Sequence, residues 1–104
     1  MKEIMLVYIT CGSKEEAEKL AEILVEKKLA ACVNYFPINS IYFWKNKIEK
    51  DKEYVMICKT LKEKFSEIEK VVKENHSYEV PAIMGIPIEK ISEDFYRYIL
   101  DFVE

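Results

Sequence analysis

The residues best suited to chemistry form one short block, HSYEVP at residues 76–81, in which the only histidine precedes a phenol and a carboxylate. The block lies where a predicted helix gives way to a strand, and connections of this kind often carry functional groups. Imidazole and carboxylate groups bind metal ions, so His76 and Glu79 are candidate ligands. A histidine at a helix end can instead stabilise the helix dipole, and Tyr78 and Glu79 can simply fix the path of the chain.

The three cysteines, Cys11, Cys32 and Cys58, are scattered and odd in number, which is typical of reduced thiols. A closed tetrahedral metal site needs four ligands, and these cysteines with one histidine match no known ligand spacing. We therefore expect any metal site to be assembled between subunits, where His76, Cys11 or Glu79 meets residues of another subunit. Cys32 and Cys58 are expected to pack in the core.

Covalent catalysis would need a nucleophile beside a base, and Cys11 with His76 is the only candidate couple. Their spacing does not support the pairing, and the sequence has no glycine-rich phosphate or dinucleotide motif. Lys47 and Lys59 could bind an anion, although lysines at strand ends are usually only solvated. The chain is therefore predicted not to be an enzyme and to carry no organic cofactor.

Composition indicates one globular domain over residues 1–104, with 50% hydrophobic and 34% charged residues. The net charge of -3 argues against a nucleic-acid partner and favours cations. The apolar run at the N-terminus is too short to span a membrane and is followed by no export cleavage signal. We therefore predict a cytoplasmic protein without a membrane partner.

Hydrophobic periodicity predicts the order β-α-β-β-α-β followed by a terminal helix. Ser13 with Glu16 forms a capping box that predicts the start of the first helix, and Thr60 with Glu63 forms a second one. Ser92 is the predicted cap of the last helix. Two β-α-β halves with right-handed crossovers build an α+β, ferredoxin-like sandwich, in which the first and third strands are central and the second lies at an edge.

The second and third strands, residues 31–44 and 47–59, predict one very long β-hairpin with a tight turn between them. Each arm would span about 45 Å, whereas a domain of this size has a radius of gyration of only ~13 Å. Pro37 and Asn39 are expected to mark a bulge or bend. The hairpin must project beyond its own subunit, so we expect other subunits to cover the aromatic residues near its tip: Tyr42, Phe43 and Trp44.

Three blocks carry a resemblance to a known family. They are KLAACVN at 28–34, SIYFWKNKIE at 40–49 with the later KT at 59–60, and HSYEVP at 76–81. In this order and spacing, the chain resembles the CutA divalent-cation-tolerance proteins over essentially its whole length. Two positions depart from the pattern of that family, since Asn46 replaces a usual glycine and Ser77 a usual proline. Asn46 should preserve the turn, whereas Ser77 is expected to loosen the loop beside the histidine.

The resemblance implies a homotrimer of ferredoxin-like subunits whose hairpins wrap their neighbours. It also implies binding of divalent cations, copper first and zinc second. The family's proposed copper ligands map onto Cys11 and His76, with Glu79 as a further candidate, and Lys59 and Tyr78 are candidates for lining clefts between subunits. An alternative of another class is a trimeric signalling protein like the nitrogen-regulatory P-II proteins, which bind small ligands in such clefts. The tight turn at residues 45–46 argues against it, because P-II proteins have a long flexible loop there.

Overall fold

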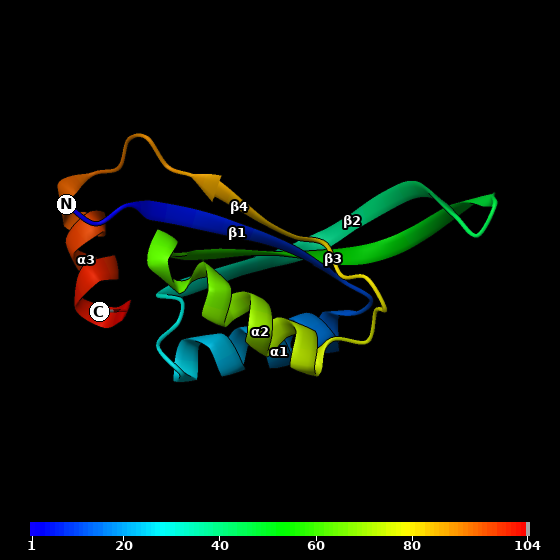
Figure 1. Cartoon of the computed structure of the whole chain (residues 1–104), viewed down its shortest axis with the longest axis horizontal. Helices are drawn as coiled ribbons and strands as arrows, with labels where there is room; N and C mark the ends of the chain where they lie inside the picture. Colours follow the sequence, from blue (N-terminus) through cyan, green and yellow to red (C-terminus); the bar gives the residue numbers. More distant parts are fainter. Residues whose placement is uncertain (104) are drawn as a thin grey trace.

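The computed structural model describes residues 1–103 and contains an antiparallel four-stranded sheet with helices (Figure 1). The elements are, in chain order, β1 (Ile4–Cys11), α1 (Lys14–Glu26), β2 (Cys32–Trp44), β3 (Lys47–Leu61), the 3₁₀ turn η1 (Lys62–Lys64), α2 (Phe65–Asn75), β4 (Ile83–Pro87) and α3 (Glu93–Val103). The strand order β2-β3-β1-β4 confirms the predicted α+β, ferredoxin-like arrangement with β1 and β3 in the centre. Within residues 1–103, no helix has the length and apolar character needed to cross a bilayer.

The two faces of the sheet are covered differently. The helices α1 and α2 pack on one face of the sheet (Figure 1). Side chains alternate along β1, and Val7, Ile9 and Cys11 join the core cluster formed with these two helices. Ile4 belongs to the opposite face of the sheet. There it packs in a second cluster with Leu61 of β3 and with Ile99 and Val103 of α3. Because α3 is short, it covers only one end of this second face. The rest of the face leaves apolar side chains exposed, among them Met84 and Ile86.

The predicted start of α1 is confirmed. The hydroxyl of Ser13 accepts a hydrogen bond from the backbone N–H of Glu16 at 3.1 Å, which satisfies one of the free donors at the helix N-terminus. In an ordinary capping box, the glutamate accepts a hydrogen bond from the N–H of the cap residue, which here would be Ser13. In this protein the Glu16 carboxylate accepts instead from the N–H of Gly12, at 3.0 Å. Glu16 is therefore drawn towards the end of β1.

The second predicted capping box is wrong. Thr60 is fully buried within β3, and its hydroxyl donates to the carbonyl oxygen of Leu29 at 2.5 Å. The helix begins later, after η1, and no side chain caps α2. The local pattern of Thr60 and Glu63 does not start a helix here, because pairing with β1 extends the strand β3 as far as Leu61.

Thr60→Val is expected to lower the free energy of unfolding by about 2 kcal/mol. Valine preserves the volume but leaves the buried carbonyl of Leu29 without its donor. Urea denaturation followed by circular dichroism measures the change. Thr60→Ser keeps the hydroxyl and loses only a methyl group, so it should cost about 1 kcal/mol. Equal stability of the valine variant and the native protein would contradict this role for the hydroxyl.

The hairpin is as long as predicted. Its ladder runs without interruption from Cys32 opposite Lys59 to Trp44 opposite Lys47, so the predicted bulge is wrong. Lys45 and Asn46 adopt left-handed conformations with φ of 49° and 67°, as a two-residue hairpin turn requires. The molecule measures 45 × 25 × 21 Å, and Figure 1 shows the hairpin tip well beyond the helices. One subunit therefore leaves this ribbon uncovered.

Candidate functional site

A cluster of three side chains lies where β1 ends. One ligand atom each of Cys11, Glu16 and His76 lies within 4.8 Å of the others. Cys11 comes from β1, Glu16 from the first turn of α1, and His76 directly follows α2. The fold thus brings together two of the predicted ligands, Cys11 and His76, with a third residue that sequence reasoning missed. Glu16 was missed because its place in a capping box already explained it.

The side chain of His76 is fully buried and both ring nitrogens are engaged. Nδ1 accepts a hydrogen bond from the N–H of Tyr78 at 3.0 Å, and Nε2 lies 2.7 Å from the carbonyl oxygen of Thr10. A carbonyl oxygen can only accept, so the proton is on Nε2 and the ring is the neutral tautomer. A metal ion at Nδ1 would have to displace the N–H of Tyr78.

The carboxylate of Glu16 holds the loop after α2. It accepts hydrogen bonds from the N–H of Ser77 at 2.7 Å, from the Ser77 hydroxyl at 3.1 Å and from Gly12, and it lies 3.9 Å from Nδ1 of His76. Burial opposes ionisation, but these hydrogen bonds outweigh it and lower the pKa of Glu16. The N–H and the hydroxyl of Ser77 both bind Glu16, and a proline could supply neither bond, which argues against the expected loosening of the loop.

Cys11 has no exposed surface, and its thiol donates to the sulfur of Met56 at 3.4 Å. Burial, together with the negative charges of Glu16 and Glu53, raises the pKa of Cys11 to about 12. A thiol with this pKa is protonated at neutral pH and is a poor nucleophile, so the Cys11–His76 couple lacks the activated thiolate that covalent catalysis needs. Cys58 is buried in the core as predicted, whereas Cys32 is partly exposed.

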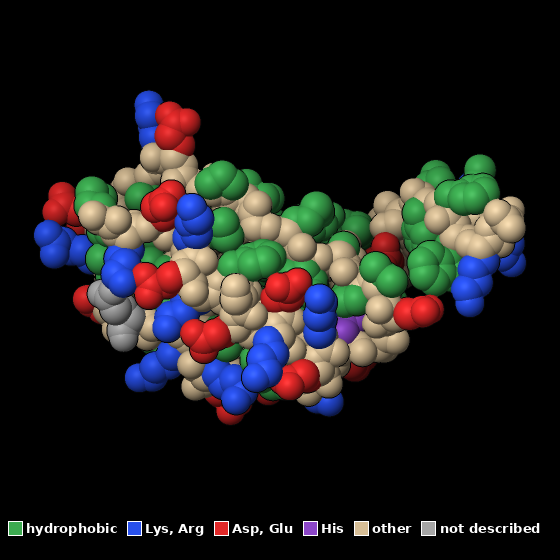
Figure 2. Space-filling view, viewed as in Figure 1, with side chains coloured by type: hydrophobic (Ala, Val, Ile, Leu, Met, Phe, Trp, Pro, Cys, Tyr) green, Lys and Arg blue, Asp and Glu red, His purple; other side chains and the backbone are tan. Residues whose placement is uncertain are grey.

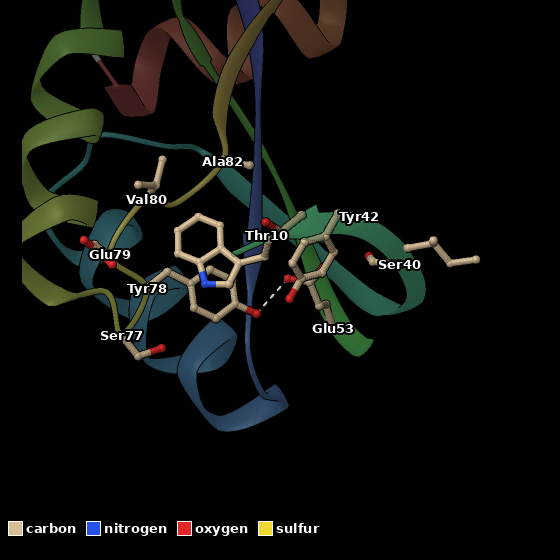
Figure 3. A pocket seen from close by; sticks show the side chains of 11 residues that line it. Thr10, Ser40, Tyr42, Glu53, Ser77, Tyr78, Glu79, Val80 and Ala82 are labelled. Carbon is tan, nitrogen blue, oxygen red and sulfur yellow. Dashed lines mark hydrogen bonds between the residues drawn. The ribbon is translucent and has the colours of Figure 1, made fainter. Parts of the chain in front are cut away.

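A cleft of about 600 Å³ lies beside this cluster, between the hairpin and the loop that follows α2 (Figure 3). The side chain of Tyr78 reaches into the cleft, and its hydroxyl donates a hydrogen bond to the carboxylate of Glu53 at 2.6 Å. Burial and this bond raise the pKa of Tyr78. Glu79 lines the cleft and is not part of the Cys11 cluster. The cleft is lined by Thr10, Ser40, Ile41, Tyr42, Trp44, Glu53, Ser77, Tyr78, Glu79, Val80 and Ala82.

Gly12 makes room for the phenol of Tyr78. A Cβ atom at this position would lie 3.3 Å from Cε1 of Tyr78 and 3.5 Å from its hydroxyl oxygen. The ring of Tyr78 also contacts His76, with 4.8 Å between the ring centroids. The cleft and the cluster therefore share a wall.

The other predicted site residues lie elsewhere. Lys59 projects over the ring of Phe95 in α3, 5.3 Å from its centroid, and does not line the cleft within one chain. Near the hairpin tip, the exposed fractions are 39% for Tyr42, 68% for Phe43 and 40% for Trp44. Figure 2 shows hydrophobic side chains gathered on this projecting end.

The fold and the cluster together define a small ferredoxin-like protein with a long projecting hairpin and a candidate cation site. Residues 5–101 match the sequence model of the family described as CutA1 divalent ion tolerance protein. The chain belongs to this family.

Named relatives agree with the assignment. The chain is 52% identical to the divalent-cation tolerance protein CutA of Archaeoglobus fulgidus, over 94% of this chain and 96% of that protein. It is 36% identical to the CutA of Pyrococcus horikoshii, with the same coverage. The solved structure of the periplasmic divalent cation tolerance protein CutA from A. fulgidus superposes with a TM-score of 0.96, at 50% identity, over 97% of this chain and 99% of that one. These findings do not favour the P-II alternative.

Proposed function

We propose that this protein is a homotrimer that binds divalent cations, copper first and zinc second, through the cluster of Cys11, Glu16 and His76. The observation that carries the proposal is the 4.8 Å span of one sulfur, one oxygen and one nitrogen ligand atom. Ligands bonded at about 2.0–2.3 Å in a tetrahedral site lie roughly 3.3–3.8 Å apart, so a modest inward movement would complete the site. Three protein ligands leave a fourth position for water or for a residue of another subunit.

The state of the three ligands makes this a low-affinity site at neutral pH. Binding requires the Cys11 thiolate, so the metal ion must displace a proton from a group with a pKa of about 12. It must also displace the N–H of Tyr78 from His76. A site of this kind responds to excess cation rather than holding one permanently, as a tolerance role requires.

The trimer is proposed because one subunit cannot cover its apolar surface. The side chains of Ile41, Phe43 and Ile48 are 71%, 68% and 65% exposed on the hairpin. Apolar residues also remain exposed on the sheet face that α3 leaves open, including Met84 and Ile86. Contiguous exposed apolar surface of this kind marks protein–protein interfaces. Neighbouring subunits would supply the missing cover.

Zinc binding tests the proposal, since Zn²⁺ has the same ligand preferences here and does not oxidise thiols. In isothermal titration calorimetry, His76→Ala is expected to bind Zn²⁺ at least about tenfold more weakly than the native protein. Cys32→Ser, which removes a cysteine outside the cluster, should bind like the native protein. Titration at increasing pH should raise the affinity about tenfold per pH unit, because one thiol proton is released.

Two outcomes would contradict this site. Indistinguishable isotherms for the native protein and His76→Ala would remove the histidine, and an affinity independent of pH would remove the thiol. Cys11→Ala provides a second variant if the histidine variant does not fold. We also propose a cytoplasmic location, which the three free cysteines support, and a non-enzymatic role, which the protonated Cys11 supports.

A further inference from the structure

The hairpin places its charges on opposite faces. Residues opposite one another in an antiparallel ladder share a face, and neighbours along a strand alternate. One face therefore carries apolar and basic residues: Ile41, Phe43, Ile48, Lys50 and Lys52. The other carries aromatic and acidic residues: Tyr42, Trp44, Glu49, Asp51 and Glu53. Lys47 also lies on the second face, at the tip, where it pairs with Glu49 at 3.6 Å.

Glu53 is the charged residue at the inner end of the acidic face, and it is 93% buried, with 7% of its surface exposed. Among residues 1–103, its only hydrogen-bond donor is Tyr78, and no ion pair reaches it. The other carboxylate oxygen accepts no hydrogen bond from the described residues, and it keeps some exposure, because every fully buried side-chain nitrogen or oxygen among them has a partner. None of the described residues that line the cleft is a lysine or arginine. The cleft therefore presents a carboxylate with no cationic side chain beside it, and a bound cation would supply the counter-charge.

The walls of the cleft indicate what kind of cation fits. Tyr42, Trp44 and Tyr78 are aromatic, and the faces of such rings attract ammonium groups and their attached carbons. Lys45 already lies over the Trp44 ring, 5.9 Å from its centroid, so this ring accepts a cation. Ca²⁺ and Mg²⁺ take six or more oxygen ligands, whereas the faces of these rings supply none. Figure 3 shows Tyr42 and Tyr78 on either side of the Glu53 carboxylate.

We propose that this cleft binds an organic ammonium group, with Glu53 as the counter-charge and Tyr42 and Trp44 as the walls around its carbon chain. The ammonium group can belong to a free amine or to a lysine of a second copy, since Lys50 and Lys52 lie on the opposite hairpin face. This inference does not rest on the proposed metal cluster, because Glu53 is not one of its three residues.

Butylammonium chloride is the probe, and the fluorescence of the only tryptophan, Trp44, is the readout. Butylammonium is expected to change the fluorescence saturably, whereas butanol and sodium chloride at equal concentration should not. Glu53→Gln should weaken binding about tenfold or more, because it removes a charge-assisted contact. Glu22→Gln, which removes an exposed charge on α1, is the matched control and should bind like the native protein.

A second variant keeps the proposal testable if Glu53→Gln does not fold. Tyr42→Leu removes one aromatic wall, keeps Glu53, and should weaken butylammonium binding about threefold or more. Sedimentation of Glu53→Gln distinguishes the two sources of the ammonium group, because self-association weakens only if a lysine of a second copy occupies the cleft. The proposal is overturned if Glu53→Gln weakens neither the binding of butylammonium nor self-association. It is also overturned if Zn²⁺ displaces butylammonium from the cleft by binding to Glu53. Loss of Zn²⁺ binding in His76→Ala would leave this inference untouched.

Discussion

Glu16→Ala is expected to lower the free energy of unfolding by about 3 kcal/mol. Three hydrogen bonds to one carboxylate are lost, from the N–H groups of Gly12 and Ser77 and from the Ser77 hydroxyl. These bonds join the end of β1 to the loop after α2, two segments more than sixty residues apart in sequence. Only 14% of the Glu16 side chain is exposed, so water cannot fully replace the carboxylate. Urea denaturation of both proteins at neutral pH measures the loss.

The same carboxylate makes stability depend on pH. Folding lowers the pKa of Glu16 from its ordinary value of 4.5, so its contribution is fully present above 4.5. It is lost as the pH falls below 4.5 and through the lower pKa of the folded state. The difference in stability between the native protein and Glu16→Gln should therefore be constant near neutral pH and shrink in acid.

Glu15→Gln is the matched control for both measurements. Glu15 is the exposed neighbour in the first turn of α1, and its replacement should cost about 0.5 kcal/mol through the helix dipole. A loss for Glu16→Ala no greater than that for Glu15→Gln would show that the Glu16 carboxylate does not hold the loop.

Phe43→Asp is expected to convert the proposed trimer into folded monomers. Phe43 is 68% exposed in one subunit, so the subunit itself should tolerate a charge there. In the assembly, each of three copies would lose about 2 kcal/mol of apolar burial and would bury a charge. The dissociation constant of the trimer should therefore rise by roughly four orders of magnitude.

Sedimentation velocity at micromolar concentration measures the assembly, and circular dichroism confirms that the variant is folded. Ser66→Asp adds the same charge at an exposed position of α2 and should leave the assembly unchanged. Native protein that sediments as a folded species of about 12 kDa would refute the trimer itself. A trimer that persists in Phe43→Asp would instead place the interface elsewhere, on the open face of the sheet.

The order of the elements, the edge position of β2 and the length of the hairpin were all predictable from the sequence. These features follow from local patterns, namely runs of β-branched and apolar residues, helical periodicity, and the Lys45–Asn46 pair that tolerates left-handed conformations. Local pattern sufficed because a few neighbouring residues fix each of these choices. The pairing of Cys11 with His76 as candidate ligands came instead from the family resemblance, because no local pattern joins these two positions.

The surroundings of the chemical groups became visible only in the folded protein. The residues around Thr60 predict a helix cap at this position. Pairing between β3 and β1 instead makes Thr60 a buried strand residue. Glu16 meets Ser77, and Glu53 meets Tyr78, across 61 and 25 positions of sequence. Burial and partners at that range depend on how whole elements pack, and these partners set the protonation of Cys11 and Glu16. The residue types were visible in the sequence, whereas their chemical state was not.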